Sequence, residues 1–89
     1  MALVRLDAWL GEFGAPRETE AQASDVEGLL MDLESRYPRL RYRLRDEAGA
    51  VRRFVRIFVD GRDILQSEGL RTPLGAHAVV DILHSIAGG

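Results

Sequence analysis

The chain has 89 residues, of which 46% are hydrophobic and 29% are charged, the composition of one small globular domain. It contains no cysteine, which excludes disulfide bridges, thiolate metal ligands and a cysteine nucleophile in this sequence. No apolar run approaches the roughly 20 residues that span a bilayer, and the first residues lack a signal-peptide pattern. We therefore expect a single domain over residues 1–89, located in the cytoplasm and away from membranes.

The net charge is −2, but the charges are unevenly divided along the chain. Between Asp7 and Glu34 there are eight acidic residues and one arginine, whereas between Arg36 and Arg56 there are eight arginines and two acidic residues. All twelve basic residues are arginines, which excludes a Schiff-base lysine or a phosphate-binding lysine. Such segregation of charge can orient a partner with the opposite pattern.

The first quarter of the sequence predicts two strands joined by a turn. Apolar residues alternate imperfectly with polar ones over residues 2–10, which indicates a first strand. Two glycines and a proline within residues 11–16 are typical of a turn. The polar segment 17–23 is expected to return as an edge strand, because charged side chains protect an edge from pairing with other chains.

One amphipathic helix is expected after this hairpin. Apolar residues recur at helical spacing from Val26 to Tyr37 and form one stripe that would face a core. Ser24 followed by Glu27 fits a capping box, and Pro38 would end the helix.

Arginines alternate strictly with apolar residues over residues 39–45, a pattern that would suit a strand. Its arginines would lie on one face. The opposite face would carry Leu40, Tyr42 and Leu44.

The second half predicts the remainder of the sheet. The β-branched and aromatic segment 54–59 indicates a strand, followed by a hairpin turn at Asp60–Gly61 and a short return at Ile64–Leu65. A loop over residues 66–78 leads to a last, largely buried strand at residues 79–83. One helix across a mixed sheet of four or five strands is an α+β arrangement of the ubiquitin-like β-grasp type.

Few residues could support catalysis or bind a metal ion. His77 and His84 lack further ligands at suitable spacing, so no metal site is predicted. Ser85 follows His84 without an orienting acid, and Asp60 and Asp63 are interpreted as solvated turn residues. The sequence is therefore not expected to be an enzyme or to bind a cofactor.

The arginine-rich segment 36–56 suggests an alternative function. Its arginines could contact phosphates, and Tyr37 and Tyr42 could stack on bases. The acidic sequence pI of about 5.6 argues against this, so a nucleic-acid-binding module is the less favoured hypothesis.

The sequence ends in Gly88–Gly89. At average glycine usage, two terminal glycines occur by chance in about one chain in two hundred. A frayed tail is one explanation. The other is that the ionised terminal carboxylate is the reactive group, on a tail without side chains that can enter a narrow channel in another enzyme.

Several segments together resemble the MoaD/ThiS family of sulfur carriers. They are residues 29–33 of the expected helix, residues 53–61, residues 63–64, and residues 80–83 leading into residues 86–89. The similarity covers most of the chain, and it is greatest to the branch that serves cysteine-synthase-like partners.

This resemblance implies a β-grasp carrier that is a substrate of other enzymes. An E1-like enzyme, of the ThiF/MoeB type, would use ATP to adenylate Gly89, and sulfur would then replace one carboxylate oxygen. The resulting thiocarboxylate would donate sulfur to an accepting enzyme in the synthesis of cysteine or another sulfur metabolite. Ile86, Ala87 and Gly88 would thread into the partner, and Leu83 would either contact it or belong to the core.

Two other functions fit the same terminus. A molybdopterin synthase small subunit is ranked second, because that branch usually has a proline where this sequence has His84. A covalent ubiquitin-like modifier is the other alternative; the absence of lysine would forbid only lysine-linked chains of the protein itself.

Overall fold

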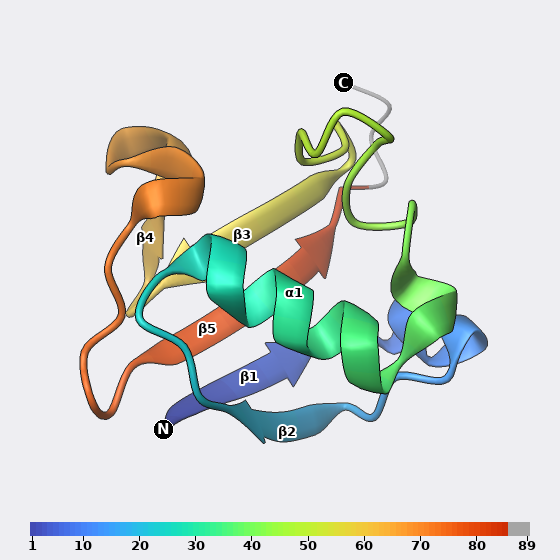
Figure 1. The fold of residues 1–89 in the computed structure, drawn as a ribbon, viewed down its shortest axis with the longest axis horizontal. Helices are drawn as coiled ribbons and strands as arrows, with labels where there is room; N and C mark the ends of the chain where they lie inside the picture. The colour runs from blue at the N-terminus through green and yellow to red at the C-terminus, as the bar shows by residue number, and fades with distance from the viewer. Residues whose placement is uncertain (86–89) are drawn as a thin grey trace.

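A computed structural model describes residues 1–85 of the chain. Five strands form one sheet with the order β2-β1-β5-β3-β4, and one α-helix packs across it (Figure 1). The central pair β1 and β5 is parallel, and the other three pairs are antiparallel. The predicted mixed sheet with one main helix is therefore confirmed. The elements are β1 (Ala2–Leu6), β2 (Glu18–Ala21), α1 (Val26–Arg36), β3 (Val55–Val59), β4 (Arg62–Asp63) and β5 (Val79–His84).

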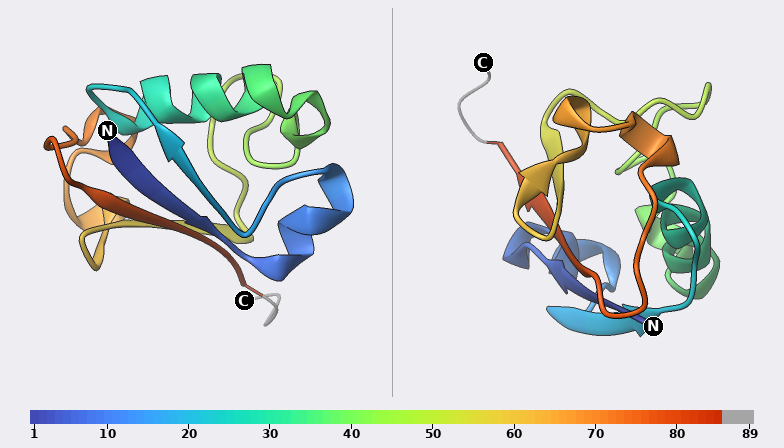
Figure 2. Two further views of the ribbon diagram at one scale, coloured as in Figure 1. Left: turned by 90° about the horizontal axis from the view of Figure 1, so that it is seen from below. Right: turned by 90° about the vertical axis from the view of Figure 1, so that its left-hand side faces the viewer.

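The core lies between α1 and one face of the sheet, and the opposite face is open (Figure 2, left). The apolar stripe of the helix meets the inward-facing residues of the two central strands, and all of these side chains are inaccessible to solvent. Burial of such aliphatic side chains stabilises the fold by about 1.5–3 kcal/mol each. They are Val26, Leu29, Leu30 and Leu33 of α1 with Val4, Val80 and Ile82 of the sheet.

The first strand is shorter than predicted. β1 ends at Leu6, and a 3-10 helix, η1 (Ala8–Phe13), follows it. Asp7 starts η1 because its carboxylate accepts a hydrogen bond from the backbone N–H of Trp9 at 3.0 Å. Gly14 ends η1 with a φ of 86°, a conformation that favours glycine. The edge strand predicted over residues 17–23 is confirmed in its central part as β2.

The helix is confirmed, but its cap differs from the prediction. Asp25 is the N-cap, and its side chain accepts a hydrogen bond from the N–H of Gly28 at 2.8 Å. The expected capping box between Ser24 and Glu27 is therefore wrong. Asp25 takes the N-cap position in place of Ser24, because aspartate is at least as good an N-cap residue as serine.

Residues 39–45 do not form the strand that their alternation would suit. A 3-10 helix, η2 (Pro38–Leu40), and turns occupy this segment. The N–H of Leu44 donates to the carbonyl of Leu40 at 3.3 Å, and both side chains are fully buried. Tyr42 adopts a φ of 66° and is 51% exposed. Local turns bury the two leucines without a partner strand. The alternation of apolar residues alone could not distinguish such turns from a strand.

The hairpin after β3 is confirmed, with Asp60 and Gly61 at φ values of 50° and 86°. The returning strand is β4, two residues earlier than expected, and the predicted return at Ile64–Leu65 belongs to a 3-10 helix, η3 (Ile64–Gln66). A further 3-10 helix, η4 (Gly69–Arg71), lies within the expected loop. Within residues 1–85, none of the helices has the length and apolar composition to cross a membrane.

Candidate functional site

The predicted reactive residues follow the end of β5. Ile86, Ala87, Gly88 and Gly89 lie outside the described residues, so the site is defined by the surface from which they continue. The N–H of Ser85 donates to the carbonyl of Phe54 at 2.7 Å, which extends the pairing of β5 with β3 to the last described residue. The described chain therefore ends directly after a central strand of the sheet.

Leu83 lies on the open face of the sheet and is 42% exposed. Alternate residues of a strand point to opposite faces, so its neighbour Ile82 is in the core whereas Leu83 is not. Leu83 pairs in register with Arg56 of β3. The structure thus places an exposed leucine two residues before the end of the described chain, beside an arginine.

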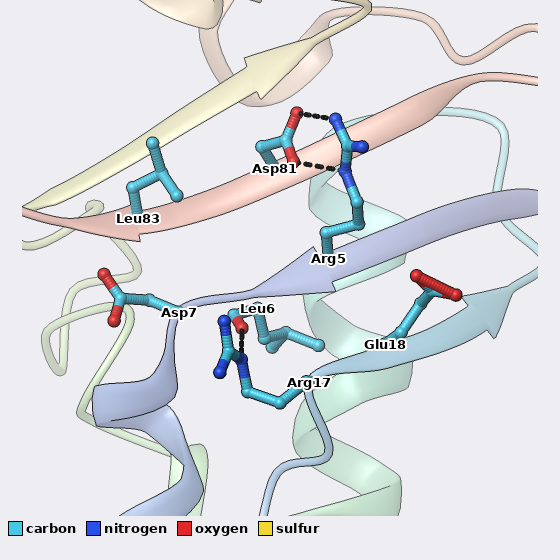
Figure 3. Close-up of a pocket in the computed structure, with 7 residues that line it drawn as sticks. All are labelled: Arg5, Leu6, Asp7, Arg17, Glu18, Asp81 and Leu83. Atoms are coloured by element: carbon cyan, nitrogen blue, oxygen red, sulfur yellow. Dashed lines mark hydrogen bonds and ion pairs between the residues drawn. The ribbon is translucent and has the colours of Figure 1, made fainter.

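A hollow of about 340 Å³ lies next to Leu83, between the ends of β1, β2 and β5. Figure 3 views it from the open face. Arg5 and Asp81 form its charged wall, with the arginine Nε and Nη2 donating to the two carboxylate oxygens at 2.7 and 3.0 Å. This pair raises the pKa of Arg5. The hollow is lined by Arg5, Leu6, Asp7, Arg17, Glu18, Asp81 and Leu83.

Asp7 connects three segments at the floor of this hollow. Its backbone N–H donates to the carbonyl of Ile82 at 3.0 Å, and its carboxylate accepts from the backbone N–H groups of Trp9 at 3.0 Å and His84 at 3.1 Å. The hydrogen bond from Trp9, followed by that from His84, lowers the pKa of Asp7. An ionised Asp7 therefore ties the end of β5 to η1.

An aromatic cluster surrounds His84 on the other side of the strand. The imidazole stacks on Trp9 with ring centroids 4.3 Å apart, and Phe54 contacts both rings edge to face. Phe13 contacts Trp9 at 5.3 Å, and the guanidinium of Arg43 lies 4.7 Å above the ring of Phe13. These contacts fix the last strand just before the predicted reactive tail.

The histidines and acidic residues that the sequence analysis considered lie in different environments. His77 lies in the loop before β5, whereas His84 is packed on Trp9. Asp63 is only 8% exposed and binds Arg56 at 2.6 Å, so the prediction that it is a solvated turn residue is wrong. Asp60 is exposed, and its side-chain carboxylate accepts a hydrogen bond from the backbone N–H of Val79 at the start of β5. Within residues 1–85, no cluster of three histidine, cysteine or acidic side chains could hold a metal ion.

Sequence reasoning missed Asp7, Trp9 and Phe54 as parts of this site. The prediction extended the first strand through Asp7 and Trp9, which hid the turn that carries both toward β5. The available signal was Asp7 itself, because an aspartate at the start of a helix accepts a hydrogen bond from the backbone N–H two residues later, here that of Trp9. Phe54 was predicted as the first residue of a strand, whereas β3 begins at Val55, and the contact of Phe54 with His84 depends on the sheet register.

A comparison with protein families shows to which family this chain is related. The ThiS family matches residues 5–89, which is nearly the whole chain. The chain belongs to the ThiS family. The predicted resemblance to ubiquitin-like sulfur carriers of the MoaD/ThiS type is thereby confirmed.

Individual relatives agree with this assignment. The sulfur carrier protein CysO of Mycobacterium tuberculosis is 33% identical over 78 residues, which cover 85% of this chain and 84% of that protein. Among solved structures, the BexX/CysO complex of Amycolatopsis orientalis contains a chain that matches with a TM-score of 0.89 and 28% identity, and each chain is covered fully. Small archaeal modifier protein 1 of Methanosarcina acetivorans matches with a TM-score of 0.88 and 26% identity, over 99% of this chain and 95% of that one. The ubiquitin-like β-grasp fold is therefore confirmed.

Proposed function

We propose that this ThiS-family protein carries sulfur as a thiocarboxylate on Gly89, as a substrate of other enzymes and without catalytic activity of its own. The observation that supports this most strongly is the family match, which runs to Gly89 itself. The absence of cysteine is consistent with it, because the sulfur would be held by the chain terminus. The reaction would take place in the cytoplasm.

The proposed chemistry takes place on the terminal carboxylate. A carboxylate oxygen attacks the α-phosphate of ATP, supplied by an E1-like adenylating enzyme, and pyrophosphate leaves. Hydrosulfide then attacks the carbonyl carbon of the acyl-adenylate and displaces AMP, which leaves a thiocarboxylate on Gly89. ATP binds the partner in this scheme, and this chain contributes the carboxylate and the surface that the enzyme recognises.

The adenylating enzyme must contact the body of this protein near Ser85. The four residues that follow can span at most about 14 Å, so the active site of the partner cannot lie far from the end of β5. Leu83 is the exposed apolar side chain on the open face at this end. We propose that Leu83 and the hollow beside it contact the enzyme while residues 86–89 enter its channel.

The accepting enzyme is proposed to belong to the synthesis of cysteine. The curated relatives are CysO proteins, and the notable feature of the Amycolatopsis orientalis structure is that its CysO forms a complex with a second protein, BexX. Complex formation by a relative with 28% identity supports docking of this chain on a partner protein.

Deletion of Gly89 tests the proposed function. The variant should not transfer sulfur in a reaction with the host adenylating enzyme, ATP, sulfide and the accepting enzyme. Its melting temperature should equal that of the full chain, because terminal residues contribute little to stability. Sulfur transfer by the shortened chain would contradict the proposal.

A second candidate function is covalent modification of other proteins. It is favoured by the likeness to small archaeal modifier protein 1, at 26% identity over nearly the whole chain. Attack of a target lysine on the same acyl-adenylate would give an isopeptide bond in place of a thiocarboxylate. Since Arg71 is the last basic residue before Gly89, trypsin would leave residues 72–89 on the modified lysine. Mass spectrometry of cell extract for that branched peptide distinguishes the two functions.

A further inference from the structure

A second groove lies on the side of β3 that faces away from β5. It has a volume of about 600 Å³ and opens between the start of β3 and the segment that contains η3 and η4. In Figure 1 this segment, in orange, stands beside β3 on the side opposite to β5. We call it the β3 groove; it is lined mainly by residues 50–57, 63–65 and 69–70. Its size is within the range of sites that bind small molecules or peptide side chains.

The floor of the groove includes a strand edge without a partner. β3 pairs with β5 along its whole length, from Val55 to Val59, but β4 pairs only with Phe58 and Val59. Residues 55–57 therefore have a strand on one side only, as far as the described chain extends. The N–H of Val55 already donates to the carbonyl of Arg52 at 3.0 Å, and the other outward-facing backbone groups of this edge are those to which an extended peptide can add as a further strand.

The rim of the groove is apolar and exposed. Leu65 is 80% exposed, the highest value among the large apolar side chains of residues 1–85. Val51 and Leu70 pack partly buried against the core at the same groove. An apolar side chain placed between Leu65 and β3 would remove this surface from water, which is the main source of affinity in such grooves.

The charges around the groove favour an acidic occupant. Its lining contains three arginines and one carboxylate. Asp63 is already bound to Arg56 at 2.6 Å, and Arg52 approaches Glu47 at 3.5 Å. Arg53 is exposed and has no acidic partner among the described residues. A carboxylate of an incoming peptide would complete this charge pattern.

We infer that the β3 groove binds an extended segment of a partner protein that carries apolar side chains next to acidic ones. The segment adds to residues 55–57 as a strand, covers Leu65 with an apolar side chain and pairs a carboxylate with Arg53. A peptide fits better than a small molecule, because it supplies backbone groups that pair with the strand edge together with side chains that cover Leu65. This inference does not depend on thiocarboxylate chemistry, since Leu83 is not among the residues that line the groove.

Selection from a library of random peptides displayed on phage tests the inference directly. The immobilised full-length protein should enrich peptides that combine aliphatic and acidic residues. The enriched peptide should perturb the backbone amide NMR signals of residues 55–57 and of Leu65. A fluorescently labelled copy of the peptide serves to measure its affinity. Leu65→Glu and Arg53→Glu should each weaken its binding at least about tenfold, as expected for central contacts of an interface.

Two matched variants control for general effects. Met31→Glu changes another exposed apolar side chain, and Arg41→Glu changes another exposed arginine, both outside the groove. Each should leave the affinity of the peptide within about twofold, since distant exposed contacts contribute little. Failure to enrich any peptide, enrichment of basic peptides, or binding that Leu65→Glu and Arg53→Glu leave unchanged would overturn the inference. Concentration-dependent dimerisation of the protein through Leu65 would also overturn it, because a second copy would then occupy the groove.

Discussion

Neighbouring residues of β5 occupy two very different environments. Val80 and Ile82 are fully buried in the core with α1, whereas Asp81 and Leu83 lie on the open face, where Asp81 binds Arg5 and Leu83 is exposed. A strand alternates its side chains between two faces, so one short segment can stabilise the fold and present a surface at the same time. Substitutions at adjacent positions of β5 should therefore affect either the stability of the fold or the recognition of a partner, but not both.

The largest effect on stability is expected from Ile82→Ala. Removing a fully buried isoleucine side chain should lower the free energy of unfolding by about 2–5 kcal/mol. Leu83→Ala is the matched control and should change it by no more than about 0.5 kcal/mol, as for most surface positions. Urea denaturation of both variants checks the difference. Equal losses at the two positions would contradict the separation of the faces.

A smaller loss of stability is expected from Asp7→Asn. Asparagine keeps one acceptor oxygen but replaces the other with an amide that cannot accept, so either the N–H of Trp9 or that of His84 loses its partner. The cost should be about 1–2 kcal/mol. Amide hydrogen exchange at Trp9 and His84 shows which contact is lost. Unchanged exchange at both positions would mean that Asp7 does not hold the end of β5.

Leu83→Glu should separate recognition from stability. The variant should fold normally, but the adenylating enzyme should convert it at least about tenfold less efficiently, because a charge would replace an apolar contact at a desolvated interface. The measurement is kcat/KM for adenylation at limiting carrier concentration. Leu65→Glu, on the far side of β3, is the matched control and should be converted like the original protein. A normal rate for Leu83→Glu would show that the enzyme docks elsewhere.

The smallest effect concerns acid stability. The side-chain hydrogen bond from Arg56, aided by the backbone N–H of Leu65, lowers the pKa of Asp63 below its ordinary value. The unfolded chain has the ordinary value of about 3.9, so the contribution of Asp63 to stability is present above that pH and is lost as the pH falls through the lower folded pKa. Asp63→Asn should therefore be less stable than the original protein at pH 7, and the difference should shrink in acid. Urea denaturation of both proteins from pH 7 to below the ordinary pKa of about 3.9 checks this prediction. A difference in the free energy of unfolding that stays constant with pH would contradict the pairing of Asp63 with Arg56.

The sequence predicted the elements whose own residues determine them. The stripe of α1 and the β-branched residues of β3 and β5 carry strong periodic signals, and the turn at Asp60–Gly61 has its own backbone preference. The alternation over residues 39–45 did not determine their structure, because Leu40 and Leu44 are also four residues apart, a spacing that a local turn can bury without a strand.

The candidate site was predictable only in part. Leu83 was identified from its place before the glycine tail, although its exposure depends on which face of β5 the helix covers. The contacts of Asp7, Trp9 and Phe54 with His84 join residues that are distant in sequence, and they arise from the register of three strands. Local sequence signals do not determine that register, so tertiary contacts of this kind could not be derived from them.

Intact-mass analysis tests the central claim most directly. The protein would be incubated with ATP, sulfide and the adenylating enzyme of its host, alongside the variant without Gly89. The account predicts a mass gain equal to the exchange of one oxygen for one sulfur in the full chain and no gain in the variant. An unchanged mass of the full chain, with the enzyme shown to be active on another carrier, would contradict it.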